Sequence, residues 1–117
     1  GLAWHRWSPE AVERARADGR IVLVDFTAKW CLTCQANKRL AIDIPSVRAK
    51  LDELGGIAFR ADYTNQDPRI AAELKRYERA GVPLVLVFPK KATEPAIILP
   101  AALTPGLVLE ALARASR

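Results

Sequence analysis

Apolar residues along this chain gather in short runs that proline, glycine and polar residues separate. The runs at residues 21–27 and 84–88 are β-branched and nearly continuous, which is typical of strands buried on both faces. Weaker runs at residues 57–61 and 96–99 indicate two more strands. The pattern therefore predicts four strands.

Helix starts are marked by a capping residue followed by proline, as in Ser8-Pro9, Asp67-Pro68 and Thr104-Pro105. Proline is favoured at the first helical position because its missing N–H needs no partner there. We expect helices over residues 9–18, 31–41, 47–54, 68–79 and 107–115. The order of elements then gives a βαβ unit followed by a hairpin and a helix. This order predicts an α/β fold with a mixed four-stranded sheet and helices on both faces.

Composition narrows the class of protein. The 117 residues suffice for one domain, residues 1–117, and 50% of them are hydrophobic, as in soluble globular proteins. The net charge of +5 comes from scattered Lys and Arg, apart from Lys90-Lys91, which favours a solvated surface over a nucleic-acid site. No apolar run is long enough to span a membrane. With no Met even at position 1, we expect an excised piece of a longer protein.

Cys31 and Cys34 are the only cysteines, and they stand where a predicted strand gives way to a helix. Helix amides favour thiolate at Cys31, so we expect an exposed nucleophile there and a less accessible resolving thiol at Cys34. A redox pair at this junction of such a sheet is typical of thioredoxin-like proteins. The alternatives are an inert pair or a zinc half-site, for which only His5 could add a Cys or His ligand.

Three more residues are candidates for the site. Asp25 lies within the apolar run, so we expect it buried beneath the dithiol, with a raised pKa, as proton acceptor for Cys34. The alternative is an exposed Asp on an edge strand. Val82-Pro83 precedes a strand, which is compatible with a cis bond beside Cys31 and with a Val82 backbone that pairs with extended substrate. The alternative is a plain strand-initiating proline.

Together these motifs resemble the thioredoxin superfamily over nearly the whole chain. Asp25 stands six residues before Cys31, Trp30 directly precedes that cysteine, and Gly81-Val82-Pro83 occupies the cis-proline position. The resemblance implies a cis Pro83 and a partly exposed Trp30 beside the site. Residues 30–34, 61–68, 81–84 and 99–105 look more specifically like the C-terminal domain of the DsbD/ScsB family.

That closer resemblance implies a periplasmic domain of an inner-membrane protein. It implies a protein-disulfide reductase, without cofactor other than its own disulfide, that takes electrons from a membrane-embedded cysteine pair. The acceptors would be an N-terminal domain or other periplasmic thiol-disulfide proteins, as in cytochrome c biogenesis. The alternatives are a soluble periplasmic oxidase or isomerase and a metal-binding module that uses Cys31, Cys34 and His5. Leu32-Thr33 lacks the histidine that strongly oxidising relatives carry, which weakens the oxidase alternative.

One departure from the family concerns charge. Relatives often carry Asp directly before the Trp and Glu seven residues after the first Cys, and this chain has Lys29 and Lys38 there. Positive charge near a thiol favours its thiolate. We therefore expect these lysines to make Cys31 more acidic than in relatives with those acids.

Overall fold

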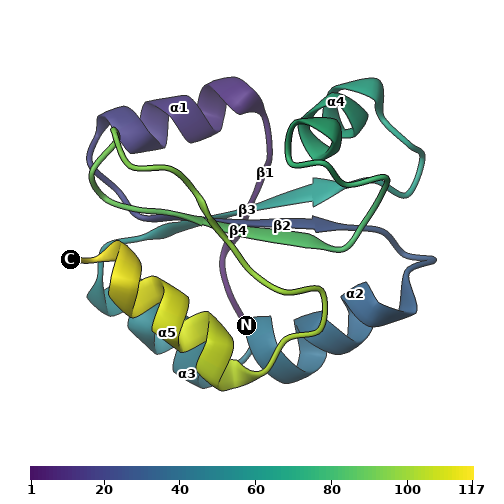
Figure 1. Ribbon diagram of the computed structural model, residues 1–117. Helices are drawn as coiled ribbons and strands as arrows, with labels where there is room; N and C mark the ends of the chain where they lie inside the picture. The colour runs from purple at the N-terminus through teal and green to yellow at the C-terminus, as the bar shows by residue number, and fades with distance from the viewer.

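The computed structural model describes residues 1–117. Five strands form one sheet in the order β1-β3-β2-β4-β5, with helices on both of its faces (Figure 1). The elements are β1 (Trp4–Arg6), α1 (Pro9–Ala17), β2 (Val22–Thr27), α2 (Leu32–Asn37), the π-helix η1 (Lys38–Ile42), α3 (Pro45–Glu53), β3 (Ile57–Asp62), α4 (Pro68–Arg76), β4 (Leu84–Phe88), β5 (Ile97–Ile98) and α5 (Pro105–Ala115).

The sheet is mixed, as predicted. β1 and β2 both run parallel to β3, whereas β4 is antiparallel to β2 and β5 is antiparallel to β4. Helices α1 and α4 cover one face, and α2, α3 and α5 cover the other (Figure 1). Every residue of the central strand β2 is buried.

Alternate residues of β2 enter two separate cores. Val24 and Phe26 join the core under α1 and α4, and Leu23 joins the core formed with η1, α3 and α5. Because side chains two apart on a strand share a face, Asp25 points to the same side as Leu23, toward the helices that follow the cysteines.

The predicted count of four strands is wrong, because Trp4–Arg6 forms a fifth. This strand pairs with β3, placing Trp4 beside Ala58 and Arg6 beside Arg60. It has three residues, and His5 and Arg6 are exposed. A strand this short at a sheet edge leaves no apolar alternation in the sequence.

All five predicted helices are present, but several begin or end at other residues than predicted. The helix expected at residues 31–41 turns into a π-helix after Asn37, where the Asp43 N–H donates to the Lys38 carbonyl at 2.8 Å. The next helix begins at Pro45, earlier than expected, because proline fits the first helical position. α4 ends at Arg76, three residues short of the prediction, and Glu78 just beyond it has a left-handed backbone, with φ of 59°. No helix has the length and apolar character needed to cross a bilayer.

Candidate active site

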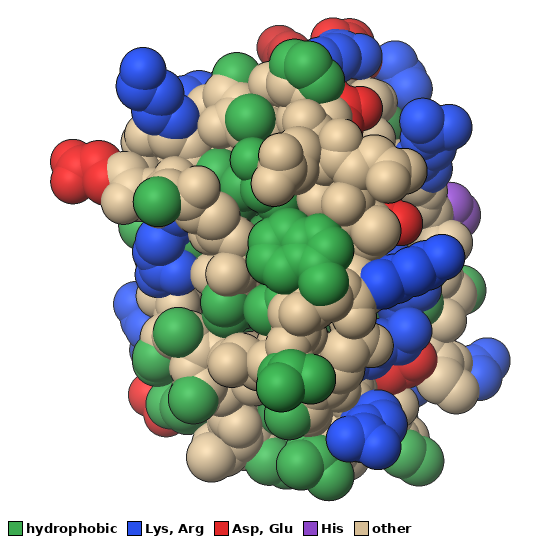
Figure 2. Space-filling view, turned by 90° about the vertical axis from the view of Figure 1, so that its right-hand side faces the viewer, with side chains coloured by type: hydrophobic (Ala, Val, Ile, Leu, Met, Phe, Trp, Pro, Cys, Tyr) green, Lys and Arg blue, Asp and Glu red, His purple; other side chains and the backbone are tan.

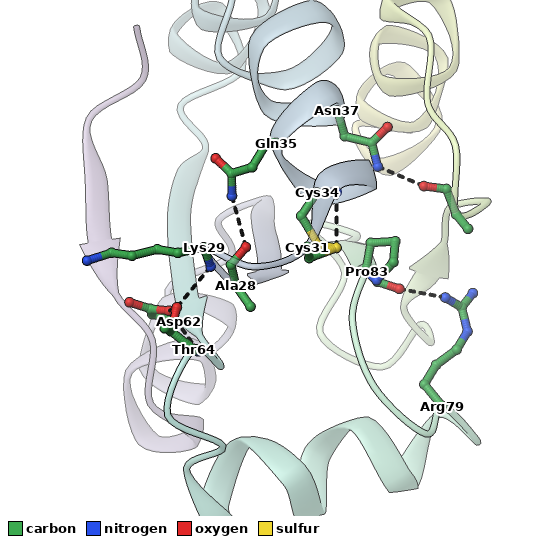
Figure 3. Close-up of a disulfide and its surroundings, with 11 residues drawn as sticks. Ala28, Lys29, Cys31, Cys34, Gln35, Asn37, Asp62, Thr64, Arg79 and Pro83 are labelled. Atoms are coloured by element: carbon green, nitrogen blue, oxygen red, sulfur yellow. Dashed lines mark hydrogen bonds between the residues drawn. A yellow bond between two sulfur atoms is a disulfide. The ribbon is translucent and has the colours of Figure 1, made fainter.

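Cys31 and Cys34 form a disulfide at the start of α2, with their Cα atoms 5.2 Å apart (Figure 3). Cys31 is the N-cap of the helix, and its Sγ accepts a hydrogen bond from the Cys34 N–H at 3.2 Å. Cys31 is 8% exposed and Cys34 is 2% exposed. The order of accessibility is as expected, but the expectation of an exposed Cys31 is wrong, because Tyr63 and Val82 pack against the pair.

The Val82–Pro83 peptide bond is cis, as the family resemblance implied, and Pro83 lies beside the disulfide (Figure 3). The Arg79 guanidinium donates a hydrogen bond to the Pro83 carbonyl at 2.9 Å, which holds the loop between α4 and β4 in place. The N–H and C=O of Val82 have no hydrogen-bond partner within the protein. An extended peptide laid along Val82 would find both groups free.

Asp25 is buried in the central strand, so the alternative of an exposed aspartate on an edge strand is wrong. Burial raises its pKa to about 6, because the carboxylate loses its hydration, and the nearby charges of Arg60 and Lys38 oppose this rise. Its Oδ2 has no hydrogen-bond partner. The buried carboxyl can therefore exchange a proton near neutral pH.

The raised pKa of Asp25 predicts a pH-dependent stability. Between pH 3.8 and about 6 the folded state holds a proton that the unfolded chain has lost, so this contribution is present at low pH and is lost as pH rises through that window. The shift corresponds to about 3 kcal/mol as an upper value. We expect Asp25→Asn to raise the free energy of unfolding of the oxidised domain by about 1–3 kcal/mol at neutral pH and to remove the pH slope.

Denaturant titrations above and below this window measure the effect. Asp62→Asn is a control of opposite sign, because hydrogen bonds from Thr64 lower the pKa of the Asp62 carboxyl. That carboxylate contributes stability at neutral pH that is lost in acid. If both variants changed the free energy of unfolding in the same direction at neutral pH, the raised pKa of Asp25 would be contradicted.

Trp30 is 53% exposed beside the cysteines, as expected of a surface near the site. Its indole N–H donates to the Thr64 carbonyl at 3.0 Å, and the Lys29 N–H donates to the Thr64 hydroxyl at 2.9 Å. Thr64 in turn donates to Asp62 (Figure 3). The loop after β3 therefore holds the segment that leads into Cys31, a role that sequence reasoning missed.

Asn37 is a second residue that sequence reasoning missed. It is buried at the end of α2, one turn beyond Cys34, and its amide spans to the loop before α5 (Figure 3). Its Nδ2 donates to the Ala101 carbonyl at 2.7 Å, and its Oδ1 accepts from the Leu103 N–H at 3.0 Å. The only sequence signal is an amide side chain one helical turn after Cys34, on the buried side of α2.

We expect Asn37→Ala to cost about 1–2 kcal/mol of unfolding free energy, because two partly buried hydrogen bonds that join α2 to the loop before α5 are lost. Denaturant unfolding at neutral pH measures the loss. Gln35→Ala is the matched control on the same helix, since the half-buried Gln35 makes one hydrogen bond, from its Nε2 to the Ala28 carbonyl at 2.9 Å. If the two losses were equal, Asn37 would not act as a clamp between helix and loop.

Lys38 and His5 complete the predicted set. Lys38 begins η1, close enough to Asp25 for its charge to lower the pKa of that carboxyl. His5 lies on the outer strand β1 and packs against the Phe59 ring at 5.9 Å. No group of three or more His, Cys, Asp or Glu side chains lies close enough together to bind a metal ion. His5 is therefore not placed with Cys31 and Cys34 as a third ligand.

The sequence profile of the Thioredoxin-like family matches residues 3–90. The chain belongs to this family. Among curated relatives, it is 38% identical over 79 residues to the thiol:disulfide interchange protein DsbD of Ralstonia nicotianae, a match over 68% of the chain and 13% of the relative. It is 35% identical over 78 residues to DsbD 1 of Pseudomonas aeruginosa, with 67% of the chain and 13% of that relative covered.

Solved structures show the same thioredoxin-like fold. The oxidised C-terminal domain of Neisseria meningitidis DsbD superposes with a TM-score of 0.71 and 23% identity, covering 93% of this chain and 97% of that one. A thioredoxin from Thermus thermophilus gives a TM-score of 0.73 with 23% identity over 97% of this chain and 85% of the other. The chain is thus a DsbD-type thioredoxin-like domain that spans about 13% of the length of its curated relatives. Its cysteine pair, at the start of α2, has the chemistry needed for thiol–disulfide exchange.

Proposed function

We propose that this domain is a protein-disulfide reductase within a larger membrane protein of the DsbD type. In this proposal it lies in the periplasm, receives electrons from a membrane-embedded cysteine pair and passes them to an N-terminal domain or other periplasmic disulfide proteins. The observation that supports it most is the disulfide at the start of α2 beside cis Pro83, in a chain similar to curated DsbD proteins.

The exchange proceeds in two displacements. The Cys31 thiolate attacks one sulfur of a partner disulfide, which forms a mixed disulfide and releases the partner's other sulfur as a thiolate. The Cys34 thiolate then attacks the Cys31 sulfur, which restores the Cys31–Cys34 disulfide and releases the second partner thiolate. Two electrons pass to the partner, and the two protons lost by the cysteines balance those its thiolates take up. The donor dithiol reverses both steps to reduce the domain again.

Asp25 and Val82 have supporting roles in this proposal. Asp25 accepts the Cys34 proton during resolution, for which a buried carboxyl with a pKa of about 6 is suited at neutral pH. The free N–H and C=O of Val82 hold the partner's backbone as an added strand, and the exposed Trp30 ring lies beside it.

Lys38 tunes Cys31 in this proposal. Lys38 follows the last residue of α2, seven residues after Cys31. A positive charge in the neighbourhood of a thiol stabilises its thiolate, so Lys38→Glu should raise the pKa of Cys31 in the reduced domain. The ultraviolet absorbance of the thiolate, followed against pH, measures this change. Lys38→Gln is the matched control and should give an intermediate pKa. An unchanged pKa in Lys38→Glu would contradict the role of this lysine.

The reduction potential distinguishes the reductase from the oxidase or isomerase. Equilibration with glutathione buffers, followed by alkylation of free thiols, should place the potential below the value of about −180 mV typical of disulfide isomerases. A value near about −120 mV, typical of strong oxidants, would contradict the reductase proposal. Stoichiometric zinc or copper uptake by the reduced protein, lost in His5→Ala, would instead support the metal-binding module.

A further inference from the structure

Three exposed apolar side chains, called here the apolar strip, lie on the segment from Trp30, next to the disulfide, to Leu40 in η1. Five large hydrophobic side chains are exposed in this protein, and three of them belong to this strip: Trp30 at 53%, Leu32 at 85% and Leu40 at 67%. Leu40 lies eight residues beyond Leu32, or about 12 Å along the helix axis. Figure 2 shows apolar side chains around a large ring at the centre of this face of the molecule. Exposed apolar side chains gathered in this way are typical of contact surfaces.

Unpaired positive charge borders the strip. Residues 26–42 contain Lys29, Lys38 and Arg39 and no acidic residue, and none of these three cations forms a salt bridge. Figure 2 shows Lys and Arg side chains on both sides of the central ring, with a few Asp and Glu side chains among them.

The other segments that border the disulfide do little to offset this charge. The loop at residues 99–104 is uncharged. Asp62 already accepts hydrogen bonds from Thr64, and Glu78 is followed directly by Arg79. The surface that borders the strip is therefore positive at Lys29, before α2, and at Lys38 and Arg39, in η1.

We propose that the docking partner is a protein whose disulfide is bordered by acidic side chains, and that its contact extends past α2 to Arg39 in η1. This proposal rests on the exchange function above and adds the kind of partner to it. Rim charges of complementary sign steer association and fix orientation. A peptide chain fits better than a lipid surface, because the nearly buried Cys31 lies beside Val82, whose free N–H and C=O can pair with a peptide backbone but not with acyl chains.

The test compares two peptide disulfides of about ten residues with the same central Cys-x-x-Cys loop. One carries Asp and Glu on both flanks, and the other carries Lys and Arg. The reduced domain is mixed with each, and its oxidation is followed by alkylation of the remaining thiols. Neutral 2-hydroxyethyl disulfide reports the intrinsic reactivity of each variant. We expect the acidic peptide to react about tenfold faster than the basic one at low salt, and only about twofold faster at about 0.5 M salt, where charges are screened.

Charge reversal locates the surface. Lys29→Glu and Arg39→Glu should each lower the acidic-to-basic rate ratio at least about threefold. The effect of Arg39→Glu shows whether the contact with the peptide extends beyond α2 into η1. Lys91→Glu is the matched control with the same change of net charge. It lies in the turn after β4, at the end of that strand opposite Pro83, and should leave the ratio unchanged.

Each outcome decides the proposal. A ratio near one, or an equal fall in Lys91→Glu, would overturn it. Equal rates together with cosedimentation of the domain with phosphatidylglycerol vesicles would assign the strip to anionic lipid and would also overturn it. Failure to react even with 2-hydroxyethyl disulfide would contradict the exchange function itself, and the docking proposal would fall with it.

Discussion

Replacing Cys34 with serine should leave the reduced domain covalently joined to its partner. Cys31 retains its place at the helix N-terminus and can still attack a disulfide, but no second thiol remains to resolve the product. Cys31 is also the more exposed of the two sulfurs. We expect most of the protein to migrate as a mixed disulfide on a non-reducing gel after incubation with a peptide disulfide. Mass spectrometry of the digested adduct should place the junction at Cys31.

The complementary variant provides the control. Cys31→Ser should form no adduct and lose exchange activity, since Cys34 is 2% exposed and lies a turn inside the helix. An adduct through Cys34 in this variant, with none in Cys34→Ser, would show that the two roles are reversed.

The second large effect concerns Asp25. Asp25→Asn should slow resolution of the mixed disulfide by about 10²-fold, because the buried carboxylate no longer accepts the Cys34 proton. Rapid mixing of reduced domain with a peptide disulfide, followed by acid quenching, measures the lifetime of the intermediate. In the natural protein the resolution rate should also fall as pH drops below about 6, where the carboxyl becomes protonated. Asp25→Asn should lack this dependence.

The pH profile separates this role from a structural one. A variant that merely loosened the fold would slow attack and resolution together, so formation of the mixed disulfide serves as the internal control. Asp52→Asn is the external control, because this carboxylate is exposed on α3, and the resolution rate should stay unchanged. An unchanged resolution rate in Asp25→Asn would show that the proton leaves Cys34 by another path.

Much of the site could be predicted because its signals are local. The cysteine spacing, the aspartate within a buried strand and the proline before β4 are all visible in short stretches of sequence. Their burial follows from two strong strands, β2 and β4, which pair over five residues each. The helix starts were also predictable, because capping oxygens and prolines act on their immediate neighbours.

The features of the fold and the site that the sequence did not predict depend on contacts between distant segments. The strand Trp4–Arg6 exists because β3 offers a free edge, and nothing in its own sequence requires it. Cys31 is nearly buried because Tyr63 and Val82 come from two other loops. Asn37 acts on residues more than sixty positions away. No local pattern reports such pairings.

The small opening at Cys31 has a kinetic consequence. Cys31 is nearly buried but more exposed than Cys34, and the free backbone of Val82 offers a place for an incoming chain. Donor and acceptor would therefore have to use the same opening in turn. Each would act as a competitive inhibitor of the other, and steady-state kinetics would be ping-pong, with an excess of either partner slowing turnover. Throughput would then depend on how quickly each partner leaves.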